Sequence, residues 1–99
     1  MKRFIALLFL SSLALMAFDG DKAYKNCIMC HGKTGEKVAL SSSPKLNTLA
    51  EQDLQNKIQA ILNGSSGMSK KYLSMHKAKL KGVEEADAAA FAAYILNLK

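Results

Sequence analysis

The sequence predicts an all-α fold with three main helices joined by loops. Apolar side chains recur at the helical spacing of three and four residues in three segments, residues 20–31, 48–63 and 83–99. No segment alternates apolar and polar side chains over four or more residues as a half-buried strand does, and there is no internal repeat. With 99 residues, the chain has room for a single domain.

The first 17 residues have the features of a secretory signal peptide. Lys2 and Arg3 precede an apolar run over residues 4–16 that only Ser11 and Ser12 interrupt, and the small Ala17 follows it. A transmembrane helix needs roughly 20 apolar residues, so cleavage after Ala17 is expected rather than retention as an anchor. The mature domain, residues 18–99, keeps 12 of the 14 basic residues against 8 acidic ones, a net charge of +4.

The mature domain is small, and its two cysteines need an explanation. A chain of this size buries too little surface to be comfortably stable by packing alone, so a cofactor bonded to the chain would help. Export places Cys27 and Cys30 in an oxidising compartment, where cysteines usually pair. A disulfide across so short a loop would add little stability, so we expect a chemical role for the pair.

The first predicted helix, residues 20–31, carries these cysteines at its end. Asp21 is the expected N-cap. The side chains of Tyr24, Cys27, Ile28 and His31 fall on one helix face at i, i+3, i+4 and i+7. Glycine, serine and lysine then dominate as far as residue 47, which predicts a loop.

The second predicted helix starts at a T-x-x-E capping box formed by Thr48 and Glu51. Gly64 is expected to end it in the left-handed conformation. The next segment, residues 70–82, is expected to hold one or two helical turns. The last helix places acidic residues near its positive end and has an apolar line through Phe91, Tyr94, Ile95 and Leu98.

The segment CIMCH, residues 27–31, contains every cysteine of the chain. In C-x-x-C-H on a helix, two thiols one turn apart can each add to a vinyl group of a haem, and the histidine is carried beneath the ring to bind iron. Cys27 and Cys30 are therefore expected to hold one covalently attached haem c through two thioethers, with His31 as an iron ligand.

Two other chemistries share part of this pattern. Thiol–disulfide exchange of the thioredoxin type needs a βαβ framework, and no strand is predicted. A structural zinc site would have four soft ligands in Cys27, Cys30, His31 and His76. However, Cys30 and His31 are adjacent, whereas zinc ligands usually come from spaced pairs.

The sequence resembles the small monohaem c-type cytochromes that bacteria export, which have the class I fold. The resemblance covers residues 18–99 and rests on DGDKAYKNCIMCHG, the T-x-x-E helix and the terminal FAAYILNLK. It implies a haem wrapped by three or more helices, one-electron transfer, and a periplasmic location. It also implies that Gly20 and Tyr24 let the first helix cross the last one closely.

The sixth iron ligand remains open on residue chemistry alone. Electron carriers usually close this position with Met or His, and Met68, Met75 and His76 all follow the second helix. Met29 lies inside the motif, on the wrong side of the ring. The resemblance favours Met75, because the family's ligand lies several residues upstream of the last helix in a lysine-bearing stretch.

The ring nitrogen of His31 that does not bind iron also needs a partner. Metal-bound histidines normally donate this N–H to an acceptor that orients the ring. In related cytochromes a loop carbonyl near a proline accepts it, which points to the segment around Pro44; a plain turn is the alternative role of this proline.

The predicted function is that of a soluble periplasmic one-electron carrier, with His31 and Met75 on iron, that shuttles electrons between respiratory redox proteins. It is not expected to be an enzyme, since six-coordinate iron offers no site for a substrate. The alternatives are a haem-based sensor or peroxidase-like protein with an open or bis-His iron, and a haemless domain stapled by zinc. The mature chain is expected to be a monomer without stable membrane insertion.

Lysines are concentrated on both sides of the sixth-ligand candidates and around CIMCH. If these lysines surround the exposed edge of the haem, their charge would steer the protein to an acidic docking surface on an oxidase, a peroxidase or a quinol-oxidising complex. Nucleic-acid binding is not expected, because the positive excess is modest and the aromatic residues fit a core. The lysines in question are Lys25, Lys33, Lys45, Lys70, Lys71, Lys77, Lys79 and Lys81.

Overall fold

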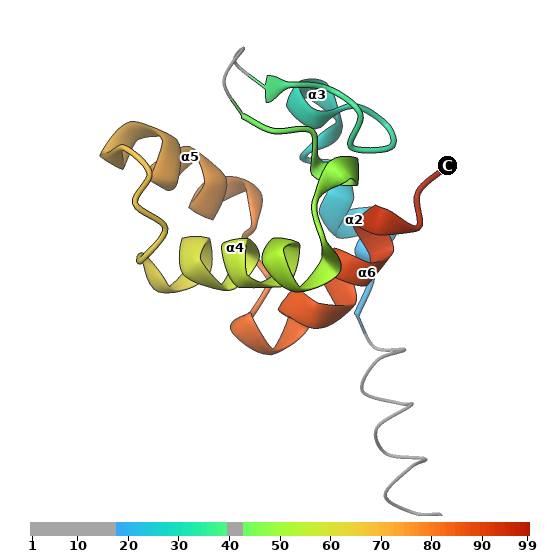
Figure 1. Ribbon diagram of the computed structural model, residues 1–99. Helices are drawn as coiled ribbons and strands as arrows, with labels where there is room; N and C mark the ends of the chain where they lie inside the picture. The colour runs from blue at the N-terminus through green and yellow to red at the C-terminus, as the bar shows by residue number, and fades with distance from the viewer. Residues whose placement is uncertain (1–17, 40–42) are drawn as a thin grey trace, which may run out of the picture.

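A computed structural model describes residues 18–39 and 43–99 (Figure 1). The predicted signal peptide, residues 1–17, lies outside the described residues. The described chain is helical and contains no strand, which confirms the all-α class. None of the helices in this part of the chain is long and apolar enough to cross a membrane. The α-helices are α2 (Gly20–Tyr24), α3 (Ile28–His31), α4 (Glu51–Asn63), α5 (Lys70–Lys79) and α6 (Ala88–Leu96), with 3₁₀ turns η2 (Leu46–Thr48) and η3 (Glu85–Asp87).

The segment predicted as one helix over residues 20–31 is two short helices, α2 and α3. A tight turn separates them, in which the Cys27 N–H donates to the Tyr24 carbonyl at 2.8 Å. The predicted N-cap, Asp21, is wrong: Asp19 caps α2, and its Oδ1 accepts from the Lys22 N–H at 3.1 Å. The backbone of Asp19 is extended, as an N-cap requires, whereas Asp21 already lies inside the helix. The CIMCH segment therefore has a short helix of its own.

Helix α4 forms where the apolar periodicity predicts it, but its start differs. The expected Thr48–Glu51 capping box is absent, because the Thr48 hydroxyl donates to the Lys45 carbonyl at 2.7 Å within η2. Ala50 is the N-cap and makes no side-chain hydrogen bond. At the other end Gly64 adopts φ 84° and ψ 9°, which confirms the left-handed C-terminal glycine.

Helix α5 is longer than the one or two turns expected, and it contains no buried residue. The last helix begins after η3, where the Glu84 N–H donates to Asp87 Oδ2 at 2.9 Å and so satisfies a backbone group at the helix start. The sequence from Ala88 to Leu96 then forms α6.

The core lies where α4 and α6 pack together and α2 crosses α6. Gly20 is buried at the crossing, and a Cβ built on it would overlap the ring of Tyr94. Tyr24, one turn further on, is 2% exposed. The predicted close crossing of the first and last helices is thus confirmed. In Figure 1, α3 and α5 both lie on the same side of α4. The buried residues are Tyr24, Leu54, Ile58, Ile61, Leu80, Ala88, Phe91, Ala92 and Ile95.

Candidate functional site

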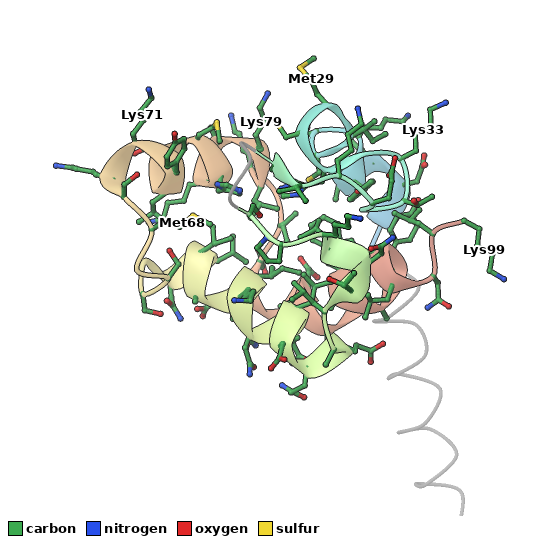
Figure 2. The ribbon with its side chains drawn as sticks, turned by 45° about the horizontal axis from the view of Figure 1, so that its top comes forward. Met29, Lys33, Met68, Lys71, Lys79 and Lys99 are labelled. Carbon is green, nitrogen blue, oxygen red and sulfur yellow. The ribbon has the colours of Figure 1, made fainter. Side chains whose placement is uncertain are left out.

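The predicted site residues line one cavity of about 340 Å³, within the usual size of a ligand pocket. Cys27, Cys30 and His31 contribute from the start and body of α3, and Met75 contributes from α5. Met29 does not line the cavity; its side chain is 89% exposed and points away from the body of the molecule (Figure 2). The structure therefore brings together side chains that are more than 40 residues apart in the sequence.

The walls of the cavity are largely apolar. Residues on the inner faces of α4 and α6 serve both as core and as wall, so a flat apolar group would lie directly against the hydrophobic core. Such a wall excludes water from the cavity. The low dielectric constant there would affect the reduction potential of a metal bound in the cavity. The apolar lining residues are Leu46, Leu49, Leu54, Ile58, Ala60, Ile61, Leu80, Phe91 and Ile95.

A few polar side chains interrupt this wall. Lys57 from α4, Asn26 before α3 and Lys79 at the end of α5 line the cavity. Sequence reasoning missed Lys57 and Asn26. The signal for Lys57 was its position three residues after Leu54 and four before Ile61, which puts it on the apolar face of α4.

The imidazole of His31 is half-buried and lacks a partner. Its Nδ1 is buried and makes no hydrogen bond to any described residue. Burial, and secondarily the neighbouring His76, lower the pKa of His31 below its usual value, so the ring is neutral near pH 7 and keeps a lone pair for a metal. Pro44 also lines the cavity, but the expected hydrogen bond to its segment is not among those of the described residues, which omit 40–42. That bond stays a prediction.

Tyr24 supports the end of the helix that carries His31. Its hydroxyl donates to the Gly32 carbonyl at 2.6 Å, directly after α3. Burial, with a smaller contribution from the Cys27 thiol, raises the pKa of Tyr24 to about 12, so the phenol stays protonated and remains a donor. The buried Tyr24 thereby fixes where α3 stops relative to the core.

Cys27 and Cys30 form no disulfide with each other; Cys27 is half-buried and Cys30 is exposed. Burial, then the neighbouring Cys30, raises the pKa of Cys27 to about 11, and Lys79 partly offsets this. Cysteines that exchange disulfides have lowered pKa values instead. The raised pKa of Cys27 therefore does not fit thioredoxin-like chemistry.

All three candidates for the sixth ligand line the same cavity. Met68 and Met75 are each 37% exposed and line the cavity. The ring centroid of His76 lies 6.3 Å from that of His31. The fold thus brings all three candidate ligands to the same cavity.

The described residues offer no ligand set for the alternative of a structural zinc site. Within residues 18–39 and 43–99, no group of three or more His, Cys, Asp and Glu side chains is arranged to hold a metal ion. By contrast, an apolar cavity with two thiols and a neutral imidazole at one wall suits the edge and the iron of a haem.

Comparisons with known proteins agree with this chemistry. The family model described as "Cytochrome c" matches residues 17–99. The chain is 34% identical over 77 residues to cytochrome c-553 of Nitratidesulfovibrio vulgaris, covering 78% of this chain and 76% of that protein. It is also 34% identical over 85 residues to cytochrome c-553 of Helicobacter pylori strain J99, covering 86% and 83%. The chain belongs to the cytochrome c family as a small class I monohaem member, with covalently bound haem c as its cofactor and electron transfer as its class of function.

Proposed function

We propose that this protein is a periplasmic one-electron carrier in which Cys27 and Cys30 bind the haem through two thioethers, His31 is the proximal iron ligand and Met75 is the sixth. The observation that carries the proposal is one apolar cavity, with Cys30 and His31 on α3 and Cys27 at its N-cap at one wall, and Met75 on α5 at another.

The residues of the chain have separate tasks in this scheme. When bound, haem supplies an iron that changes its oxidation state by one electron. Cys27 and Cys30 hold its edge, and Tyr24 positions the end of α3 on which His31 lies. The side chains of α4 and α6 keep water away. A thioether from Met75 favours ferrous iron and gives a higher reduction potential than a second imidazole would.

If His31 and Met75 both bind the iron, no ligand position is left for a substrate, so the protein is proposed to be a carrier and not an enzyme. A sensor or peroxidase-like protein needs an open position on iron, and three side chains able to fill that position line the cavity: Met68, Met75 and His76.

We further propose that residues 1–17 are removed on export and that residues 18–99 form the mature domain. The match of the cytochrome c family to residues 17–99 supports this boundary. Mass spectrometry of protein recovered from the periplasm of a bacterial host should find Phe18 at the N-terminus and the mass of one added haem.

The partners are proposed to be redox proteins with acidic docking surfaces. The eight lysines named for this role are all exposed. Among the described residues only Lys25 is in an ion pair, with Asp21 at 3.8 Å, so the other charges are free to act on a partner. Lys33, Lys71 and Lys79 project outward over α3 and α5 in Figure 2. Of these three, Lys79 also lines the cavity.

The test of the ligand set is a visible spectrum of the chain expressed with c-type haem maturation. Haem that stays on the denatured protein, and is lost with Cys27→Ala/Cys30→Ala, would support the thioethers. The ferric protein should show the weak charge-transfer band of sulfur on iron, abolished by Met75→Ala and kept by the matched Met68→Ala. A band that disappears only with Met68→Ala would reassign the ligand, and a colourless protein would refute the proposal.

A further inference from the structure

His76 lies in the same cavity as His31, although the scheme above gives it no task. These are the only two histidines of the chain. Their ring centroids are 6.3 Å apart and their planes are inclined by 54°. The two imidazoles are therefore near enough for one metal ion to reach both.

The distance between the two rings is the one expected for two imidazoles on opposite sides of one metal ion. An imidazole nitrogen binds a first-row metal at about 2.0 Å, and a five-membered ring with bonds of about 1.33 Å has its atoms about 1.1 Å from its centre. Two such rings in line with the metal have centroids about 6.2 Å apart, against the 6.3 Å observed. The inclination of the planes is no obstacle, since each ring can turn about its own metal–nitrogen axis.

A hydrogen bond also prepares His76 as a ligand. Its Nδ1 lies 2.8 Å from the Tyr72 carbonyl oxygen. Because a carbonyl can only accept, Nδ1 carries the proton and Nε2 is left with a lone pair. Metal-binding histidines typically donate the other ring N–H to such a carbonyl. The hydrogen bond to Tyr72 therefore already holds His76 in the tautomer that binds iron through Nε2.

Met75 and His76 cannot both reach the iron at once. Adjacent residues of an α-helix point about 100° apart, so α5 must turn to exchange one for the other. Helix α5 has no buried residue. It lies between Gly67 and Gly82, which have φ 79° and 90° and open space where a Cβ would be. Few buried contacts oppose such a turn.

We propose that His76 is a reserve ligand, which takes the sixth position on iron whenever the thioether of Met75 is withdrawn. This inference rests on the proposed function, in which Met75 is the ligand of the intact protein. With His76 bound, the iron stays six-coordinate and closed to small ligands, while its reduction potential falls because an imidazole replaces a thioether.

The experiment compares haem-loaded Met75→Ala with Met75→Ala/His76→Ala, and uses Met68→Ala/Met75→Ala as the matched control. Met75→Ala should be low-spin, without the sulfur–iron band, with a lower midpoint potential than the intact protein, and slow to bind carbon monoxide when ferrous. Removing His76 as well should give high-spin iron that binds carbon monoxide rapidly, and added imidazole should restore the low-spin spectrum. The Met68 control should behave as Met75→Ala does.

Three results would overturn the proposal. Met75→Ala with open, high-spin iron would refute the reserve role alone, provided that the intact protein keeps its sulfur–iron band. A sulfur–iron band in Met75→Ala that Met68→Ala removes would give the reserve role to Met68. Absence of the band from the intact protein, together with iron opened by His76→Ala alone, would make His76 the resting ligand and refute the Met75 assignment too. Met75→Leu, which keeps the side-chain volume, replaces Met75→Ala if that variant does not accumulate.

Discussion

The backbone of Gly20 lies against the ring of Tyr94, with no room for a side chain between them. The Tyr94 hydroxyl also donates to Asp21 Oδ1 at 3.4 Å, so the same tyrosine contacts two successive residues of α2. This contact sets how α2 crosses α6. It thereby sets where the following turn delivers α3 and the CIMCH segment.

Gly20→Ala should destabilise the haem-loaded protein by about 1–3 kcal/mol, because an added methyl group must push the Tyr94 ring aside. Urea unfolding followed by circular dichroism measures this. The double variant Gly20→Ala/Tyr94→Ala removes the overlap and should lose less stability than the two single variants summed. Strict additivity would show that the close approach carries no strain.

Stability should fall above pH 10 through ionisation of Tyr24. Its pKa is raised from 10.0 to about 12 in the folded chain, so its contribution is fully present below pH 10 and is lost as pH rises towards 12. Burial is the larger cause. The smaller one, the Cys27 thiol, disappears when that sulfur forms a thioether, so a loss of about 1–3 kcal/mol is expected.

The matched variant for this effect is Tyr24→Phe, which keeps the ring and removes the ionisable hydroxyl. At pH 7 it should be about 1 kcal/mol less stable, because the hydrogen bond to Gly32 is lost. Between pH 10 and 12 its stability should fall less steeply than that of the intact protein, since the two chains differ only in the Tyr24 hydroxyl. Equal slopes in denaturant unfolding would contradict the assignment.

Phe91→Ala should cost about 3–5 kcal/mol in holoprotein stability, because Phe91 is both core and cavity wall. Its side chain is 1% exposed. Tyr72 is 40% exposed, so Tyr72→Ala should change the stability by about 0.5 kcal/mol or less. Thermal unfolding of the two variants tests this difference. Similar midpoints would mean that the cavity wall formed by Phe91 does not stabilise the protein.

Charge reversal near the cavity should slow reaction with anionic oxidants. Lys71→Glu/Lys79→Glu should lower the second-order rate with ferricyanide by about two- to tenfold at low salt, because local positive charge raises the encounter rate. The effect should shrink at about 0.15 M salt, where charges are screened beyond about 8 Å. Lys99→Glu, on the C-terminal segment away from α5 in Figure 2, is the control and should change the rate less. An equal fall in rate for Lys71→Glu/Lys79→Glu and for Lys99→Glu would argue against steering by the charges near the cavity.

Several details of the fold could not be predicted from local patterns. Apolar spacing located α4 and α6, because each helix buries a continuous face. The last helix, predicted over residues 83–99, is shorter, because a 3₁₀ turn precedes it and α6 runs from Ala88 to Leu96. The same spacing over residues 20–31 predicted one helix, but a tight turn at Cys27 breaks it. Thr48 has the sequence of a cap, yet its hydroxyl bonds to Lys45 instead. Helix α5 was underestimated because it has no buried face to create a periodic signal.

The sequence by itself determined the covalent chemistry of the site. The CIMCH segment holds two thiols and an imidazole within five residues. Because this spacing is local and does not depend on how the rest of the chain packs, it indicates haem attachment by itself. Only the tertiary structure decided what lies opposite. It placed Met68, Met75 and His76 in one cavity, added Lys57 to its wall, and set the His31–His76 separation at 6.3 Å. The physical reason is that these residues meet through the packing of α5 and α4, which no local spacing encodes.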